Sequence, residues 1–263
     1  MAQARMPAVF IGHGSPMNTF AQNKYTQAWQ QFGRTAPRPK AILAISAHWF
    51  LPGTAVTSML KPKTIHDFGN FPQALFDFQY PAPGSPALAK RVSELLAPLA
   101  VRADEEWGLD HGTWSVLTHV YPQAEIPVVQ LSIDSMQPPS FHYDLGERLA
   151  PLRDEGILIV GLGNIVHNLR MLNWKDEAPA HDWAVRFSDT VRGHILQREH
   201  EPLVDYPKLG ADGKLAIPTP EHYLPLLYVL GAQQPGESAG VLVDGIQNAS
   251  ISMLSVVVGN SGS

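Results

Sequence analysis

Four histidines follow or border short apolar segments, and together they could form a metal centre. His13 follows PAVFIG, His48 follows AILAISA and His167 follows GILIVGLGNIV, while His222 stands in PTPEHYLPLLYVLG. Side chains at the ends of strands, on loops held by a rigid sheet, commonly carry the chemistry of α/β proteins. Imidazole is also the commonest transition-metal ligand. The sequence therefore predicts a metal site built from distant segments, with nitrogen and oxygen ligands.

The motifs around these histidines also allow structural interpretations. In GHGSP, Gly12 and Gly14 let the backbone turn tightly beside His13, and a purely structural turn is the alternative to a metal site. In SAHWF, a ligand at the strand exit is favoured over a buried structural histidine. For His167 in GLGNIVHNL, the alternatives are a metal ligand, a general acid or base, and a helix-capping segment.

Two further motifs pair a histidine with a carboxylate. In PTPEH, Glu221 and His222 are adjacent, and neighbouring helical residues point about 100° apart. We therefore expect only one of them to bind an ion, and Glu221 would alternatively favour the helix N-terminus. In WGLDHGTW, His111 is a candidate acid or base, and a local hydrogen bond with Asp110 in a surface turn is the alternative.

The other histidines carry weaker signals. His66 and Asp67 lie in TIHDFGNFP, an aromatic-rich loop that could close over a substrate. The remaining histidines fall on predicted helices without convergent partners, and we expect surface or interface positions for His119, His142, His181, His194 and His200.

Apolar runs and the segments between them predict the elements that position these side chains. Nearly continuous apolarity is typical of strands covered on both faces, and such runs lie at 7–12, 41–47, 54–59, 126–133, 156–163, 239–245 and 250–259. Amphipathic segments predict helices at 20–32, 85–99, 111–122, 139–156, 181–198 and 220–231. The alternation indicates an α/β fold, a single domain over 1–263 with a central mixed, mostly parallel sheet flanked by helices and the active site at the strand ends. The last two strands are expected to form an antiparallel edge.

The composition limits the function classes. The net charge is −5, charged residues make up 16% and no Lys or Arg run occurs, which argues against nucleic acid or an anionic membrane as partner. The absence of cysteine excludes disulfides and thiolate ligands. The N-terminus lacks a signal-peptide core, and no run approaches the ~20 apolar residues of a membrane span. We expect a cytoplasmic protein, and the low charge density leaves room for a homo-oligomer.

Seven motifs in order resemble the 4,5-DOPA extradiol dioxygenase family, part of the class III extradiol ring-cleaving dioxygenases. They are GHGSPM, SAHWF, TIHDFGNFP, YPAPGSP, DHGTW, VHNLR and TPEHYLPLLYVLGA, and the resemblance runs from about residue 6 to about residue 257. It implies an oxidoreductase that opens catechols such as L-DOPA with O₂, giving semialdehydes of the 4,5-seco-DOPA type. The implied partners are a small-molecule catechol and O₂, with no nucleic acid and no membrane.

The same resemblance implies the roles of the histidines. His13, His48 and His222 match the metal ligands, and His167 matches a further histidine that is a ligand in some members and an acid or base in others. His111 would lie nearby as an acid or base. The ion would be Zn²⁺ or Fe²⁺, one per chain.

Ring-cleaving relatives commonly use two histidines and a carboxylate, whereas here the matching segment presents His222 beside Glu221. An all-histidine site suits zinc as well as iron, and zinc has no redox chemistry. A zinc hydrolase with Glu221 or Asp110 as base is therefore one alternative, and a catechol- or metal-binding protein without turnover is another. A set of aromatic side chains is expected to wall the substrate pocket, namely Trp49, Phe50, Phe68 and Phe71.

Overall fold

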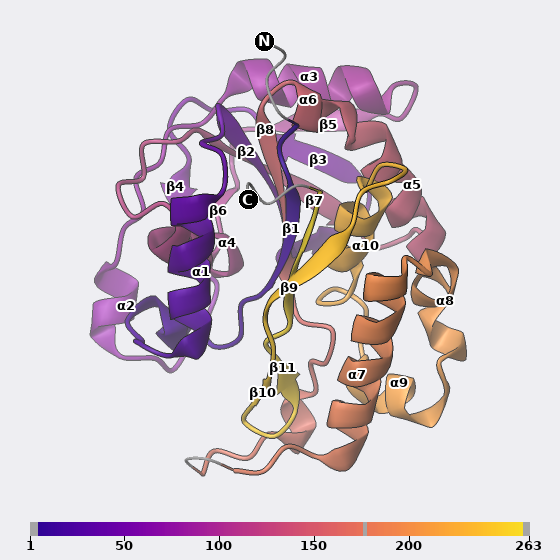
Figure 1. The fold of residues 1–263 in the computed structure, drawn as a ribbon. Helices are drawn as coiled ribbons and strands as arrows, with labels where there is room; N and C mark the ends of the chain where they lie inside the picture. Colours follow the sequence, from indigo (N-terminus) through magenta and orange to yellow (C-terminus); the bar gives the residue numbers. More distant parts are fainter. Residues whose placement is uncertain (1–4, 176–177, 260–263) are drawn as a thin grey trace.

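A mixed β-sheet forms the centre of the molecule. The structure, a computed structural model, describes residues 5–175 and 178–259. Within these ranges, eight strands pair in the order β5-β3-β7-β2-β8-β1-β12-β9 (Figure 1). Their bounds are β1 (Ala8–Gly12), β2 (Ala41–Leu51), β3 (Thr54–Thr57), β5 (Val101–Asp104), β7 (Val128–Asp134), β8 (Ile157–Gly163), β9 (Ala239–Val243) and β12 (Ser255–Val258).

The middle of the sheet is parallel and its edges are mixed. Strand β2 pairs in parallel with β7 and β8, and β8 pairs in parallel with β1. Strand β12 runs antiparallel to both β1 and β9, and β3 runs antiparallel to β7. The predicted fold class and the antiparallel edge are therefore confirmed.

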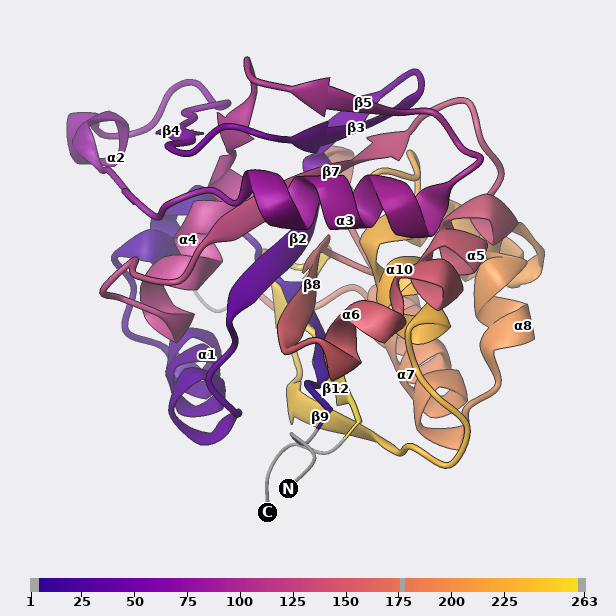
Figure 2. The same cartoon turned by 90° about the horizontal axis from the view of Figure 1, so that it is seen from above.

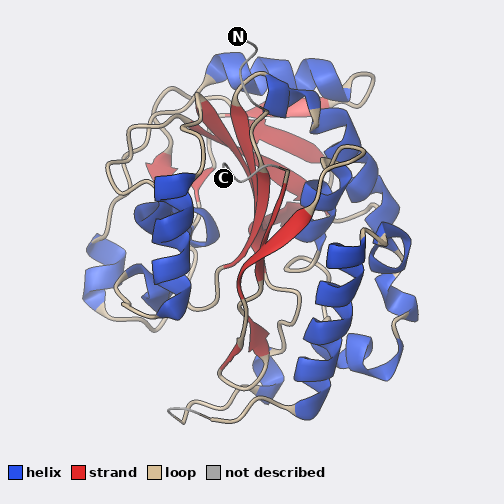
Figure 3. Ribbon diagram, viewed as in Figure 1, coloured by secondary structure: helices blue, strands red, loops and turns tan. Residues whose placement is uncertain are grey.

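Helices cover both faces of the sheet, as Figures 1 and 2 show. Helices α1 (Lys24–Thr35) and α4 (His111–Val120) lie on one side. The other side holds a larger set, comprising α3 (Pro86–Leu96), α5 (Pro139–Leu149), α6 (Pro151–Asp154), α7 (Asp182–Gln197) and α10 (Leu224–Gly231). Figure 3 shows the same two helical layers with the sheet between them.

The two-sided cover explains why the central strands are apolar without alternation. Along β1, Ala8 and Phe10 belong to the core on the α10 side, while Val9 and Ile11 belong to the core on the α1 side. Side chains on a strand point alternately to opposite faces, so a sheet buried on both faces needs apolar residues at every position. Burial of both apolar faces is the main stabilising contribution to this fold.

Short elements fill the connections. Two pairs of two-residue strands, β4 (Lys63–Thr64) with β6 (Gly108–Leu109) and β10 (Ile246–Gln247) with β11 (Ile251–Ser252), tie loops near the strand ends. The small helices are α2 (Gln73–Asp77), α8 (His200–Val204) and α9 (Gly210–Ala216), with 3₁₀ turns at Pro16–Thr19, Leu169–Met171 and Tyr206–Lys208. No helix in the described ranges is long and apolar enough to cross a membrane.

Two of the histidines assigned to the surface are buried, which corrects that expectation. Nε2 of His119 donates to the Asn18 carbonyl at 2.8 Å, so that ring nitrogen carries the proton. His142 is fully buried on α5, and its Nδ1 lies 3.0 Å from the hydroxyl of Tyr228 on α10. Their helices pack against the fold on the faces that carry these rings, which sequence spacing alone did not indicate.

Because His142 is buried, we expect it to make stability depend on pH. Burial lowers the His142 pKa from 6.5 to about 4. Between these values the unfolded chain binds more protons than the folded chain, so the free energy of unfolding decreases as the pH falls from 6.5 to 4. Replacing His142→Asn should reduce that slope by up to about 1.4 kcal/mol per pH unit, measured by urea unfolding at several pH values. The control is His194→Asn on a partly exposed side chain, and an unchanged slope in His142→Asn would contradict the expectation.

Candidate active site

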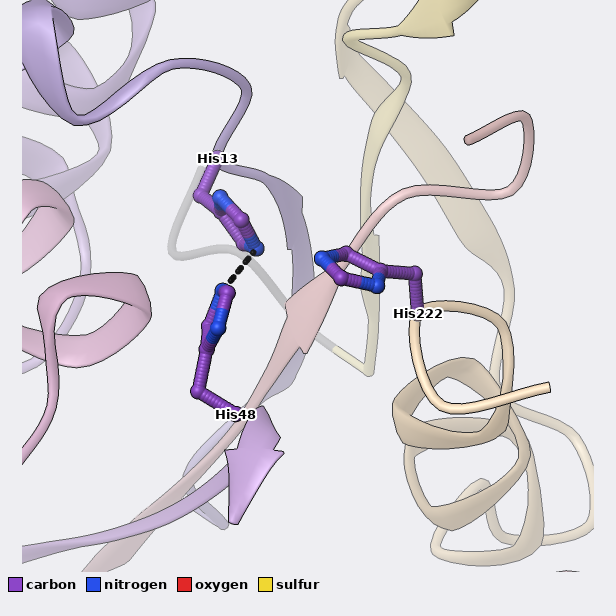
Figure 4. Close-up of side chains that lie close together, drawn as sticks. All are labelled: His13, His48 and His222. Carbon is purple, nitrogen blue, oxygen red and sulfur yellow. Dashed lines mark hydrogen bonds between the residues drawn. The ribbon is translucent and has the colours of Figure 1, made fainter. Parts of the chain in front are cut away.

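Five histidines meet at the carboxyl ends of the central parallel strands. His13 follows β1, His167 follows β8, His111 begins α4, and His222 precedes α10. His48 lies inside β2, where the pairing with β7 shifts register between Ile45 and Phe50. The prediction that His48 directly follows its strand is therefore wrong. The prediction that it lies at the same end of the sheet as His13 and His167 is confirmed. Figure 4 shows the rings of His13, His48 and His222 turned toward one another.

Backbone contacts hold the segments that carry these rings close together. The His13 amide donates to the Gly163 carbonyl at 3.2 Å, and the Asn164 amide donates to the His222 carbonyl at 2.8 Å. A methyl group at Gly163 would overlap that His222 carbonyl. Gly163, the last residue of β8, therefore permits close approach between the strand end and the His222 segment.

Replacing Gly163→Ala is expected to push the His222 segment away from β8. Overpacking of this kind destabilises by roughly 1–3 kcal/mol, and here it would also weaken metal retention. Urea unfolding and metal content per chain measure the two effects. The matched control is Gly193→Ala in α7, where the nearest atom to an added methyl group lies 3.9 Å away, so stability should be unchanged or higher. Equal effects of the two substitutions would contradict the close-approach explanation.

The ring nitrogens of three histidines converge on one point. Nε2 of His13 lies 3.3 Å from Nε2 of His48. One nitrogen each from His13, His48 and His222 lies within 4.8 Å of the other two. Nε2 of His222 is buried and has no hydrogen-bond partner. A buried nitrogen without a partner costs free energy unless a proton donor or a cation satisfies it.

The opposite nitrogens fix the tautomers. Nδ1 of His13 donates to the Gly14 carbonyl at 2.9 Å. Nδ1 of His48 lies 3.4 Å from Asp67 Oδ2, and Nδ1 of His222 lies 3.3 Å from Glu221 Oε1. With the protons on Nδ1, all three lone pairs are on Nε2 and point inward. Metal-binding histidines commonly show this arrangement, in which an oxygen acceptor orients each ring.

The electrostatics keep these rings neutral. Burial, with a smaller contribution from the nearby His111, lowers the His13 pKa to about 3. Burial also holds the pKa values of His48 and His222 well below 6.5. A histidine must be neutral to bind a metal ion, and with these lowered pKa values the three rings are neutral at neutral pH. The residues therefore fit a divalent cation.

Asp67 connects two of the histidines, and sequence reasoning did not predict this role. Its Oδ1 accepts the backbone N–H of His111 at 2.9 Å and lies 3.0 Å from Nδ1 of His111, while its Oδ2 faces His48. Burial would raise the Asp67 pKa, but hydrogen bonds from His111 and its charge lower it below the ordinary value. The hydrogen bond between Asp110 and the His111 ring, which the sequence allowed as the alternative to an acid or base role, is not found among the contacts of the described residues. The motif DHG provides the position of His111, but its partner comes from the distant TIHDFGNFP loop.

Asp110 instead anchors the start of α4. It is fully buried, and its carboxylate accepts from Ser46 Oγ at 2.8 Å, Gln130 Nε2 at 2.7 Å and the Thr113 amide at 3.1 Å. Burial and the charge of Asp67 raise the Asp110 pKa. These contacts cap the helix and fix the direction in which His111 leaves it.

His167 lies beside the three converging rings. Its ring stacks on that of His222 with centroids 3.5 Å apart and planes 7° from parallel. Burial lowers the His167 pKa to about 4, and His111 contributes to this shift. Asn168 caps the following 3₁₀ turn by accepting from the Arg170 amide at 3.1 Å. Asn168 therefore caps the turn, and the His167 ring lines the cavity.

The histidines form the floor of a cavity of about 330 Å³. Phe68 and Phe71 line it, as predicted, but Trp49 and Phe50 do not. Trp49 is buried and stacks on Trp107, because it points to the opposite face from His48. The register shift in β2 turns Phe50 toward the core on the α10 side. Further apolar parts of the wall come from the segment after β8 and from β11, namely Leu169, Leu172, Trp174 and Ile251.

Comparison with known proteins places this geometry in a family. The model of the catalytic LigB subunit of aromatic ring-opening dioxygenase matches residues 7–259. The chain belongs to the LigB family. This LigB-type chain is 55% identical to 4,5-DOPA dioxygenase extradiol of Escherichia coli (strain K12), over 98% of this chain and 97% of that one. It is 38% identical to 4,5-DOPA dioxygenase extradiol of Beta vulgaris, over 89% of each chain.

A solved structure supports the same assignment. The crystal structure of an uncharacterized protein from Escherichia coli K12 matches with a TM-score of 0.87 and 50% identity, covering 97% of this LigB-type chain and 100% of that one. The comparisons confirm the resemblance to extradiol dioxygenases and the expectation of a ring-cleaving oxidoreductase. LigB-type dioxygenases depend on a metal, and the converging histidines are a group that could hold one.

Proposed function

We propose that this LigB-type chain opens the ring of catechols, L-DOPA among them, with O₂ at one metal ion held by His13, His48 and His222. The convergence of three Nε2 lone pairs, each ring oriented through Nδ1 by an oxygen acceptor, is the observation that supports it most directly. Fe²⁺ bound there would supply the electron transfer between catecholate and O₂ and favour loss of the phenolic protons. For L-DOPA the product would be 4,5-seco-DOPA.

The reaction balances without a further reductant. The O–O bond breaks, and so does the ring C–C bond next to the two hydroxyl-bearing carbons. Both oxygen atoms enter the product, and the electrons that reduce O₂ come from the catechol. The chain must therefore bind one organic substrate, exclude water and move protons.

The proposed proton acceptor is His111. Asp67 beside Nδ1 fixes the tautomer and stabilises the protonated ring, which leaves Nε2 to accept a phenolic proton and return it later. His167, neutral and stacked on His222, would donate or accept a hydrogen bond at the substrate oxygens. Phe68 and Phe71 would hold the aromatic ring over the histidines and keep water away.

The hydrolase alternative has less support from the geometry. A zinc hydrolase needs a carboxylate base beside the attacking water. Among the described residues, neither Glu221 nor Asp110 lines the cavity, and each is already engaged by neighbouring donors. The aromatic and apolar walls suit a catechol ring instead.

Reconstitution with Fe²⁺ tests the proposal. Protein purified without added metal is analysed for its elements, loaded with Fe²⁺ without oxygen, mixed with a panel of catechols and exposed to O₂. We expect O₂ uptake and a yellow ring-opened product, and no turnover from the zinc-loaded form, since zinc cannot transfer electrons. No product from any catechol at full iron occupancy would overturn the proposal. Ester or amide hydrolysis by the zinc form without O₂ would establish the hydrolase instead.

A further inference from the structure

Apart from its five histidines, the cavity has no ionisable side chain in its lining, as far as the described residues extend. Besides the histidines and Phe68 and Phe71, its surface is formed by Leu169, Leu172, Trp174 and Ile251, and its polar side chains are the neutral Ser15, Gln247 and Asn248. Asp67 lies behind the histidine rings, where His48 and His111 engage it. Away from the histidines, the described lining thus provides neither a cation for a carboxylate nor an anion for an ammonium group.

Two of the apolar side chains are unusually exposed. Trp174 is 73% exposed and Leu169 is 60% exposed, although both are large and apolar. They line the same cavity as the histidines, so the apolar surface extends from the interior to the solvent. Exposed apolar surface that is continuous with a cavity commonly marks a ligand-binding surface, because a bound apolar group removes it from water.

The substituent of a bound catechol would meet this surface. If the two catechol oxygens lie at the histidines, the rest of the ring and its substituent can extend only along the walls. A charged group placed against such walls loses hydration without gaining a partner, which is unfavourable. An alkyl or aryl substituent instead buries apolar area on both sides of the contact.

We propose that the substrates preferred by this site are catechols with an uncharged, mainly apolar ring substituent, rather than catechols with a charged side chain such as L-DOPA. The inference rests on the proposed function and specifies its substrate class. L-DOPA remains a substrate under this inference, but its ammonium and carboxylate groups add nothing to binding.

Binding to the zinc-loaded protein without O₂ tests the preference independently of turnover. The dissociation constants of catechol, 4-propylcatechol, 3,4-dihydroxyphenylacetate and L-DOPA are measured by calorimetry. Each fully buried methylene group tightens binding by about fourfold, so 4-propylcatechol should bind at least about tenfold more tightly than catechol. L-DOPA and 3,4-dihydroxyphenylacetate should bind no more tightly than catechol.

Variants at the exposed apolar residues connect the preference to this surface. Trp174→Ala should remove most of the gain shown by 4-propylcatechol, while Met136→Ala, at a side chain that is also 73% exposed but does not line the cavity, should leave the gain intact. Leu169→Arg places a cation at the cavity surface and should tighten 3,4-dihydroxyphenylacetate by about threefold at low salt.

The outcomes separate this inference from the proposed function. If L-DOPA binds as tightly as 4-propylcatechol while the iron form opens catechols, the inference is overturned and the function stands. If Trp174→Ala and Met136→Ala affect 4-propylcatechol equally, the proposed surface is wrong. If no catechol binds and none is opened, both the inference and the proposed function fail.

Discussion

His13→Ala protein is expected to lose its metal and its dioxygenase activity together. The substitution removes one of three converging nitrogens, and two remaining histidines bind a divalent ion far more weakly. We expect less than one tenth of the wild-type iron after dialysis and a fall in kcat/KM of at least about a thousandfold, or about 4 kcal/mol of transition-state stabilisation. Elemental analysis and O₂ uptake measure the two quantities on the same sample.

The control for this experiment is a histidine outside the site. His194→Ala changes a partly exposed ring on α7 that pairs with Glu199, and it should keep both iron and activity. Far-ultraviolet circular dichroism of both variants shows whether the fold is retained. Stoichiometric iron and normal turnover in folded His13→Ala would exclude this histidine from the metal site, and the same experiment applies to His48→Ala and His222→Ala.

Asp67→Asn is expected to have the second largest effect. The carboxylate faces Nδ1 of both His48 and His111 and also accepts the backbone N–H of His111, so one substitution disturbs a proposed ligand and the proposed proton acceptor. Loss of an acceptor behind a metal-binding histidine typically costs 10–100-fold, roughly, in metal affinity or activity. The wrong histidine tautomer costs more, so we expect kcat to fall about a hundredfold or further even at full iron loading.

A second carboxylate provides the matched comparison. Glu221 lies 3.3 Å from Nδ1 of His222 and close to His167, so Glu221→Gln should weaken iron binding but leave proton transfer by His111 intact at full iron occupancy. At full iron occupancy, the kcat of the double variant Asp67→Asn/His111→Gln should be little lower than that of His111→Gln, because in proton transfer the two residues act as one unit. Additive losses in the double variant, or equal kcat for Asp67→Asn and wild type, would contradict the assigned role.

The central strands were predictable because both their faces are buried. Short, continuously apolar runs such as AILAISA and GILIVGLG are typical of strands buried on both faces. Their alternation with predicted helices favoured the α/β class. Strand β5 was missed because it lies at the sheet edge and its sequence, VRAD, exposes its middle residues. Helices α8 and α9 were missed because each is short and lies in a segment rich in proline and glycine.

His13 and His167 were predictable from their place after strands, and His48 and His222 from their motifs near apolar runs, whereas the partners of these histidines were not predictable. Asp67 contacts His111 across 44 positions of sequence, and no local pattern encodes that contact. Two of the four aromatic residues predicted to line the cavity, Trp49 and Phe50, do not line it. For Phe50 the reason is the register shift inside β2, which turns its side chain toward the core. Local sequence indicates where a strand ends, but a bulge and a long loop are determined by packing that only the folded structure contains.

The stoichiometry of oxygen consumption tests the central claim most directly. Protein samples with graded iron content, prepared by mixing iron-loaded and metal-free chain, are given a limiting amount of one catechol under excess O₂. The account predicts that one O₂ is consumed for each catechol opened, without release of hydrogen peroxide, and that the initial rate is proportional to bound iron. Loss of catechol without matching O₂ uptake, or a rate independent of iron content, would contradict it.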